Sequence, residues 1–120
     1  MLFIYKSDSA ERSEIVSFPH SMWGVVESLN KMVINPARVE VVVAPLALHI
    51  PLVQASLKKE IAIATQNVNL KGSGAFTGEL SADQLKDFGI PWAIVGHSER
   101  RHVFGETDAI VAARVEFAQS

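Results

Sequence analysis

Three short apolar runs, separated by segments with helical periodicity, constrain the fold of this chain most strongly. The runs are Val39–Ala44 (VEVVVA), Ile61–Thr65 (IAIAT) and Trp92–Val95 (WAIV). The first run is rich in β-branched residues and apolar at every position except Glu40, as expected of a strand covered on both faces. Strands that alternate with helices and short connections form right-handed βαβ units and a parallel sheet. The sequence therefore predicts the α/β class.

The first two helices are predicted on either side of the run Val39–Ala44. Apolar residues recur at helical spacing from Met22 to Val33, with Ser21 at the N-cap position and Asn35-Pro36 as a stop. A second helix is predicted within Leu48–Lys59, with Pro51 in its first turn and two lysines in its last turn. Each helix therefore precedes one of the first two strands.

Two later helices are predicted around the run WAIV. Ser81 and Gln84 have the spacing of a capping box, and the helix that they begin ends at Phe88, before Gly89 and Pro91. From about Thr107 a last helical pattern continues to the end of the chain. Three strands and their helices are compatible with either a small doubly wound sheet or part of a (β/α)₈ barrel.

Composition and charge exclude several classes of protein. The chain has 120 residues, of which 48% are apolar, and this is typical of a globular domain. A net charge of -2 with intermixed acidic and basic residues provides no basic stripe for nucleic acid or an anionic membrane. Pro45, His49 and Pro51 interrupt the most apolar window, so no transmembrane segment is predicted. The lack of cysteine and of a recognisable signal peptide fits a cytoplasmic protein.

The segment WAIVGHSERRHVFGE passes from the third apolar run through Gly96 directly into six consecutive polar residues. Side chains just past the carboxyl ends of parallel strands converge on one face of the fold, where ligands bind. Ser98–Arg101 fits one helical turn that begins beside His97. The positive end of that helix disfavours an imidazolium, so His97 would be neutral and able to donate to a developing oxyanion. A purely structural histidine is the equally weighted alternative.

Two other motif interpretations are weak. The glycines of Gly72–Gly78 do not have the spacing of a dinucleotide-binding loop and stand too far from the preceding strand. Ser98 follows His97 in GHSER, but Arg100 takes the place of the second glycine that a nucleophile elbow requires. Neither nucleotide binding nor serine hydrolysis is therefore expected.

A metal site is also disfavoured. His97 and His102 flank Glu99, but their spacing differs from the zinc motif H-E-x-x-H, and no third ligand is evident in the sequence. We therefore interpret His102 as a surface histidine.

A long stretch of the sequence resembles a known enzyme family. Gly74–Asp108 (GAFTGELSADQLKDFGIPWAIVGHSERRHVFGETD) closely resembles the central segment of triosephosphate isomerase, and ATQN and VEVVVAP resemble neighbouring strands of that family. The resemblance extends from about Val25 to the last residue. It implies an incomplete TIM (β/α)₈ barrel with three to four βα units, a fold of which triosephosphate isomerase is itself the type example. The implied regions are a divergent leader, residues 1–20, and the partial barrel, residues 21–120.

The resemblance implies an activity and the residues that support it. Members of this family interconvert dihydroxyacetone phosphate and glyceraldehyde 3-phosphate, in glycolysis and gluconeogenesis, by proton transfer through an enediolate. His97 matches the neutral electrophile that polarises the substrate carbonyl, a role for which this family is itself the established example. Ser98 matches the serine beside the histidine, and Glu99 matches a buried carboxylate close to the catalytic lysine. No cofactor or metal is implied.

The resemblance also implies a homodimer. The loop Gly72–Glu79 matches the loop that protrudes into the partner subunit, where Thr77 would approach the active site. Glu79 would pair with an arginine of that subunit equivalent to Arg100. The remaining positions expected near the dimer interface are Asn67 and Glu106.

The sequence departs from the family pattern at both ends. The first strand of the family ends in Asn-x-Lys, whose lysine binds the substrate phosphate, and residues Met1–Val16 contain no such motif. The general-base glutamate, its lid loop and the glycine-rich phosphate loops belong to a later part of a barrel of about 250 residues. We therefore expect a fragment that is inactive alone. The alternative is a truncated, non-catalytic interaction module derived from that enzyme.

Overall fold

The structure, a computed structural model, describes residues 2–5, 14–16 and 21–119. It contains two compact units, Met1–Ala64 and Thr65–Ser120, each of which is considered by itself. The predicted leader, residues 1–20, falls mostly outside the described residues, and so does its predicted boundary at residue 20. The division into leader and partial barrel therefore stays a prediction.

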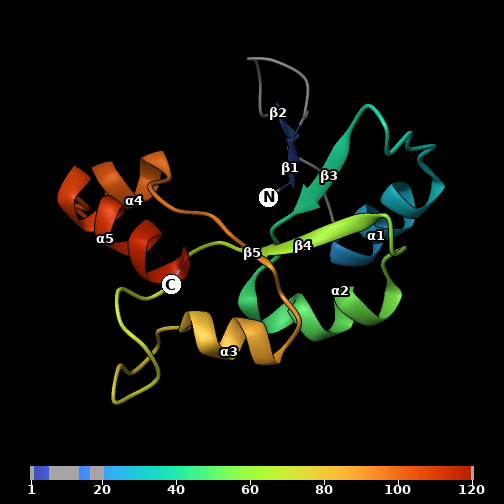
Figure 1. Cartoon of the computed structure of the whole chain (residues 1–120). Coiled ribbons are helices and arrows are strands. Elements are labelled where there is room, and N and C mark those ends of the chain that lie inside the picture. The colour runs from blue at the N-terminus through green and yellow to red at the C-terminus, as the bar shows by residue number, and fades with distance from the viewer. Residues whose placement is uncertain (1, 6–13, 17–20, 120) are drawn as a thin grey trace. The chain divides into compact units, whose positions relative to one another are not determined.

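The strands of the first unit form a sheet of mixed direction. They are β1 (Leu2–Tyr5), β2 (Glu14–Val16), β3 (Glu40–Val43) and β4 (Ile61–Thr65). As Figure 1 shows, β3 and β4 lie side by side, and they pair in parallel with Val42 opposite Ala62. The predicted parallel pairing and the α/β class are confirmed for these two strands. The pairing of β1 with β3 is antiparallel and was not predicted.

The core of the first unit depends on β3 and β4. Val41, Val42 and Val43 are all buried, so neighbouring residues that point to opposite faces of β3 are both covered. This confirms the prediction of a strand buried on both faces. In β4 the buried side chains include Ile61 and Ile63.

Helix α1 (Met22–Lys31) begins where the sequence predicts and ends earlier. The Ser21 hydroxyl accepts a hydrogen bond from the Gly24 amide at 3.1 Å, which confirms the predicted N-cap. Val26 and Leu29 form the buried face. The prediction that the helix reaches Val33 is wrong, because the backbone is already extended at Met32 and Val33 is fully exposed.

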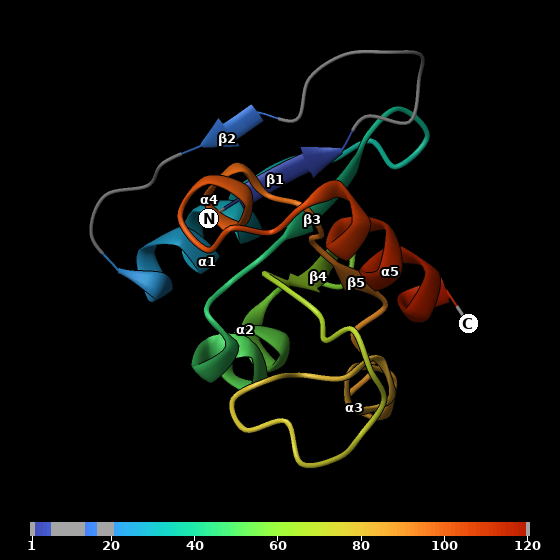
Figure 2. The ribbon, with the colours of Figure 1, turned by 90° about the vertical axis from the view of Figure 1, so that its left-hand side faces the viewer.

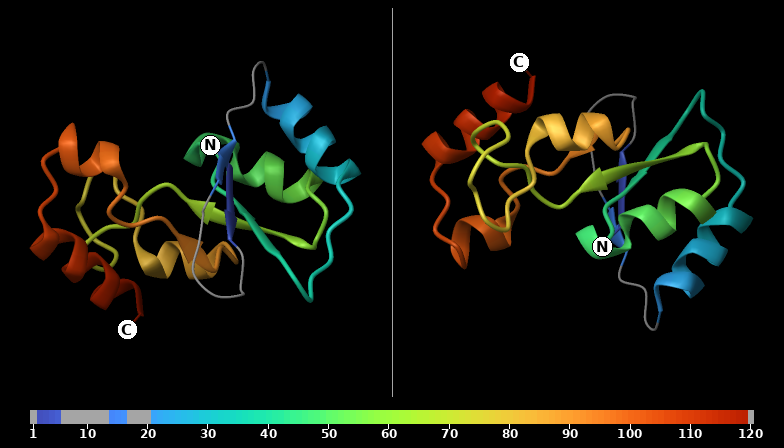
Figure 3. Two further views of the ribbon diagram at one scale, coloured as in Figure 1. Left: turned by 90° about the horizontal axis from the view of Figure 1, so that it is seen from above. Right: turned by 90° about the horizontal axis from the view of Figure 1, so that it is seen from below.

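The segment after β3 forms a short 3₁₀ helix, η1 (Ala47–His49), and then helix α2 (Ile50–Ser56). Pro51 lies in the first turn of α2, as predicted. The predicted place of the lysines in the last turn is wrong, since α2 ends at Ser56. The Lys58 amide instead donates to the Asn30 side chain at 2.8 Å, and α1 and α2 lie side by side (Figure 3). Lys58 therefore bonds α1 and does not extend α2 by a further turn.

The second unit contains one short strand and three helices. They are α3 (Ala82–Asp87), β5 (Trp92–Ala93), α4 (Ser98–His102) and α5 (Asp108–Gln119). Figure 2 shows α4 leading through a short connection into α5. All three helices are close to their predicted positions. The predicted strand Trp92–Val95 is two residues too long, because the chain leaves the strand before Gly96, whose φ is +69°.

The capping box that begins α3 is complete. The Ser81 hydroxyl accepts from the Gln84 amide at 3.2 Å, and the Gln84 side chain accepts from the Ser81 amide at 2.8 Å. Ser81 is 3% exposed, and its hydroxyl also lies 3.1 Å from the Ser73 hydroxyl. The capping box therefore fixes the start of α3 and holds the preceding loop.

None of the helices in the described ranges 2–5, 14–16 and 21–119 has the length and apolar character needed to cross a membrane.

We expect Ser81→Ala to lower the free energy of unfolding by about 1 kcal/mol, because it removes the N-cap acceptor of α3. Ser28→Ala is the matched control, since the Ser28 hydroxyl is exposed and only bonds the Gly24 carbonyl within α1. Its effect should stay within about 0.5 kcal/mol. Urea denaturation followed by circular dichroism measures both values, and equal losses for the two variants would contradict the assigned cap.

Candidate functional site

His97 stands at the junction between β5 and α4, where a glycine permits a sharp turn. Gly96 has a φ of +69°, a region that residues with a side chain rarely adopt. A Cβ atom at Gly96 would lie 2.9 Å from Cγ1 of Val111 in α5. Both the turn and the contact with α5 therefore require glycine immediately before His97.

The imidazole of His97 caps the N-terminus of α4. Its Nδ1 accepts a hydrogen bond from the Glu99 amide at 3.3 Å, and the side chain is 15% exposed. A ring nitrogen that accepts an amide hydrogen carries no proton, so the neutral ring carries its proton on Nε2. The predicted placement of the ring at a helix N-terminus is confirmed.

The carboxylate of Glu99 also lies near the ring, with Oε2 3.7 Å from Nδ1 of His97. This contact would favour a protonated Nδ1 and so competes with the amide hydrogen bond. The Glu99 carboxylate is 69% exposed, so water screens its attraction for a proton on Nδ1. The amide contact is shorter, and we therefore place the ring proton on Nε2. The burial expected for Glu99 is wrong for this chain, because α4 presents the residue to solvent.

The other residues of α4 divide between the surface and a buried cluster of charges. Ser98 is exposed beside His97, and His102 is exposed, as predicted. Arg100 instead contacts Glu106, and its Nε and Nη2 donate to Oε1 of Glu106 at 2.9 and 2.6 Å. Its guanidinium also lies 4.7 Å from the ring centre of Phe104. Arg100 therefore connects α4 to the segment that follows it.

Glu106 is the centre of the buried cluster. Its side chain is 5% exposed, and Oε1 also accepts from Nη2 of Arg114 at 2.9 Å. The Arg114 side chain, 7% exposed, donates from Nη1 to the Val68 carbonyl as well. Nη1 of Arg114 lies 3.7 Å from the Glu79 carboxylate. We call Glu79, Arg100, Glu106 and Arg114 the charge cluster, and it joins the loop at Glu79 to α4 and α5, which are neighbours in sequence.

The structure brings together some of the predicted site residues but not all of them. Arg100, Glu106 and Glu79 share the charge cluster, whereas Thr77 is exposed on the loop and is not a member of the cluster. Asn67 is half-buried, and its Oδ1 has no hydrogen-bond partner among the described residues. Glu79 meets Arg114 of its own chain, a contact that sequence reasoning did not predict.

Sequence reasoning missed the two arginines that organise this region, Arg101 and Arg114. In Arg101, Nε donates to the Gly96 carbonyl at 2.9 Å and Nη1 donates to Asp108 at 2.5 Å. Arg114 lies at helical spacing from Ile110 and Val111 in the last helix, and it is buried. An arginine at such a position is a signal of a buried ion pair, because an unpaired charge is rarely buried.

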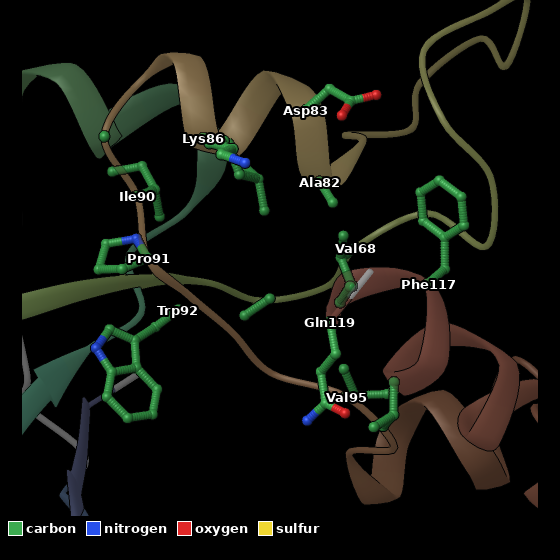
Figure 4. Close-up of a pocket in the computed structure, with 15 residues that line it drawn as sticks. Val68, Ala82, Asp83, Lys86, Ile90, Pro91, Trp92, Val95, Phe117 and Gln119 are labelled. Atoms are coloured by element: carbon green, nitrogen blue, oxygen red, sulfur yellow. The ribbon is translucent and has the colours of Figure 1, made fainter.

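A pocket of about 780 Å³ in the second unit does not coincide with these residues. Figure 4 shows that it is lined by α3, by the segment around Pro91 and Trp92, and by Phe117 and Gln119 of α5. Neither His97 nor a member of the charge cluster lines it. The mainly apolar walls offer few groups for catalysis, so the candidate active site is the region of His97.

The described part of the chain contains no group of three or more histidine, aspartate or glutamate side chains positioned to hold a metal ion.

We expect Glu106→Gln to lower the free energy of unfolding by about 3 kcal/mol, because the buried Arg114 guanidinium then keeps only the more distant and partly exposed Glu79 carboxylate as a counter-charge. Glu116→Gln is the matched control, since Glu116 is exposed on the same helix as Arg114. Its effect should stay within about 0.5 kcal/mol. Chemical denaturation of both variants tests the assignment, and a Glu106→Gln protein as stable as the control would show that the charge cluster is not a stabilising element.

Comparison with known proteins identifies the family to which this chain belongs. The family model of triosephosphate isomerase matches residues 19–120. The chain is 46% identical over 95 residues to the triosephosphate isomerase of Neurospora crassa, with 78% of this chain and 38% of that protein covered. It is 49% identical over 94 residues to that of Coprinopsis cinerea, with 78% and 37% covered. The chloroplastic enzyme of Secale cereale is 46% identical over 103 residues, with 81% and 35% covered.

The chain thus spans less than two fifths of the length of these relatives. The family match supports the expected fold class, an incomplete (β/α)₈ barrel, and agrees with the parallel pairing of β3 with β4. Both comparisons and the order of strands and helices lead to one conclusion: the chain belongs to the triosephosphate isomerase family.

Proposed function

We propose that this chain is part of a triosephosphate isomerase, which interconverts dihydroxyacetone phosphate and glyceraldehyde 3-phosphate by proton transfer through an enediolate. The family membership supports the reaction and its triose phosphate substrate. The geometry of His97 carries the proposal for this chain in particular. The ring is fixed by its Nδ1 at the N-terminus of α4, so the ring proton lies on Nε2, and we assign this N–H to a substrate oxygen.

His97 acts in this proposal as a neutral electrophile. In the ground state, Nε2–H donates a hydrogen bond to the substrate carbonyl oxygen. As the general-base glutamate, which another segment of the complete enzyme would supply, takes a proton from the neighbouring carbon, negative charge develops on that oxygen and the hydrogen bond becomes stronger. Preference for the transition state over the ground state accelerates the reaction. Triosephosphate isomerase is itself the established example of a neutral histidine in this role.

The residues beside His97 support the site. Ser98 and Glu99 form the first turn of α4, and the Glu99 amide fixes the tautomer of the ring. The Glu99 carboxylate, which is exposed in this chain, is available to interact with a lysine supplied by another segment of the complete enzyme. We assign Ser98 and Glu99 supporting roles, and neither touches the reacting atoms.

The dimer interface is a further part of the proposal. The exposed loop that carries Thr77 extends from a base held by Arg114 through Val68 and Glu79. A loop held at its base can enter a partner subunit without losing its conformation. We propose a homodimer in which Arg100 faces the Glu79 of the partner. The other positions assigned to this interface are Asn67 and Glu106.

Two further predictions concern the N-terminal residues and the cellular location of the protein. Residues 1–20 would form a divergent leader that precedes the partial barrel. A cytoplasmic location also stays a prediction, because one of the relatives is a chloroplastic enzyme. Neither prediction alters the chemistry assigned to His97.

We expect the 120-residue chain to show no measurable isomerase activity by itself. The resemblance assigns the general-base glutamate, the substrate lysine and the phosphate loops to segments with no match in this sequence, and loss of a general base alone commonly costs about 10²-fold to 10⁴-fold. A coupled assay on rigorously purified chain measures the turnover. Turnover that disappears on His97→Gln would contradict this expectation, and an inactive chain that still binds partners would favour the interaction module.

We expect activity when residues 21–120 replace the matching segment of the Neurospora crassa enzyme. In this chimera His97→Gln should lower kcat about 10²-fold to 10³-fold, as for loss of one oxyanion donor. His102→Gln is the matched control, since His102 is exposed five residues further along the same segment, and its kcat should stay within about twofold. Equal losses for the two histidines would mean that the electrophile is misassigned.

A further inference from the structure

The peptide group that precedes His97 is held by a side chain from the helix that follows it. Nε of Arg101 donates to the Gly96 carbonyl at 2.9 Å. This carbonyl belongs to the peptide bond between Gly96 and His97, so the contact fixes the plane from which the His97 side chain projects. Arg101 also continues the helix backbone, because its amide donates to the His97 carbonyl at 3.1 Å. Arg101 therefore donates hydrogen bonds to the carbonyl groups of both Gly96 and His97.

Helix α5 contacts both Arg101 and the turn at Gly96. Nη1 of Arg101 donates to the Asp108 carboxylate at 2.5 Å, and Asp108 is the first residue of α5. Val111, one turn further along α5, fills the space beside Gly96. The start of α5 thus contacts the turn before His97 directly through Val111 and indirectly through Arg101. A glycine with a positive φ gains a defined conformation from these two contacts.

We propose that Arg101 is a positioning residue for His97, held in place by Asp108. The inference rests on the proposed function, since it gives Arg101 a role in the activity assigned to His97. The Arg101 guanidinium does not touch substrate in this proposal. It sets the direction of the imidazole by fixing the Gly96 carbonyl, and it keeps Nδ1 of His97 within reach of the Glu99 amide.

Lysine cannot replace arginine in this role. The guanidinium donates from two different nitrogen atoms in one plane, Nε to Gly96 and Nη1 to Asp108. Lysine keeps the positive charge but has a single nitrogen atom at the end of a flexible side chain. Arg101→Lys therefore removes the two-point contact without removing the charge. Asp108 is 95% exposed, so its own contribution is the smaller one.

The direct test uses hydrogen exchange of the Glu99 amide in the full 120-residue chain. We expect Arg101→Lys to speed this exchange about tenfold, because the acceptor on His97 becomes less fixed. Asp108→Asn should have a smaller effect in the same direction. The amides of Leu57 and Leu85, which bond within the two units, report general stability and should not change.

Arg38→Lys is the matched control for this exchange experiment, because Arg38 is exposed in a loop of the first unit. Exchange that accelerates at Glu99 alone supports a positioning role. Unchanged exchange at Glu99, or equal acceleration at Glu99, Leu57 and Leu85, would overturn it, because the arginine would then be irrelevant or only generally stabilising.

A double-mutant cycle in the Neurospora crassa chimera tests the same role through activity. Arg101→Lys should lower kcat about tenfold to 10²-fold with little change in KM, as expected for a misdirected catalytic group. In the His97→Gln background, Arg101→Lys should have no further effect, because there is no longer an electrophile to position. Independent, multiplying losses would overturn the proposal. A chimera without any activity would instead reject the proposed function, while the exchange of Glu99 still decides the role of Arg101.

Discussion

The carboxylate of Glu106 is the interaction on which the second unit depends. One of its oxygen atoms accepts from two arginines, Arg100 and Arg114, in a place from which water is almost excluded. Burial of an unpaired carboxylate or guanidinium costs desolvation free energy. The attraction between the two buried groups offsets part of this cost. Because Arg114 also holds the Val68 carbonyl, the loop after β4 is linked to the same carboxylate as α4 and α5.

This convergence explains how such short elements hold a histidine in place. Helix α4 has five residues, far fewer than an isolated helix needs to be stable in water. It is stabilised by two contacts: the His97 ring caps its start, and Arg100 in its middle connects it to Glu106. The geometry of His97 is therefore a property of the whole second unit. The local sequence GHSER specifies the turn but does not hold it.

The sequence predicts the elements of this chain well where the signal is local. The capping box of Ser81, the N-cap of Ser21 and the apolar run of β3 depend on residues close in sequence, and each is found in the structure. The predicted end of α2 was wrong because the observed end depends on Asn30, a residue of another helix. Arg101 was missed for a related reason, since its partner Asp108 is only seven residues away but meets it through the turn between α4 and α5. Long-range polar contacts carry no periodic signal in the sequence.

We claim that His97 presents a proton on Nε2 because its Nδ1 accepts a hydrogen bond from the Glu99 amide. Nitrogen-15 NMR of the histidine ring, in chain labelled only at histidine, tests this claim most directly. Assignment by comparison with His97→Gln isolates the relevant signals from those of the other three histidines. We expect Nε2 of His97 to carry the proton and Nδ1 to carry none. A proton found on Nδ1 would contradict the hydrogen bond and, with it, the electrophile assigned to this chain.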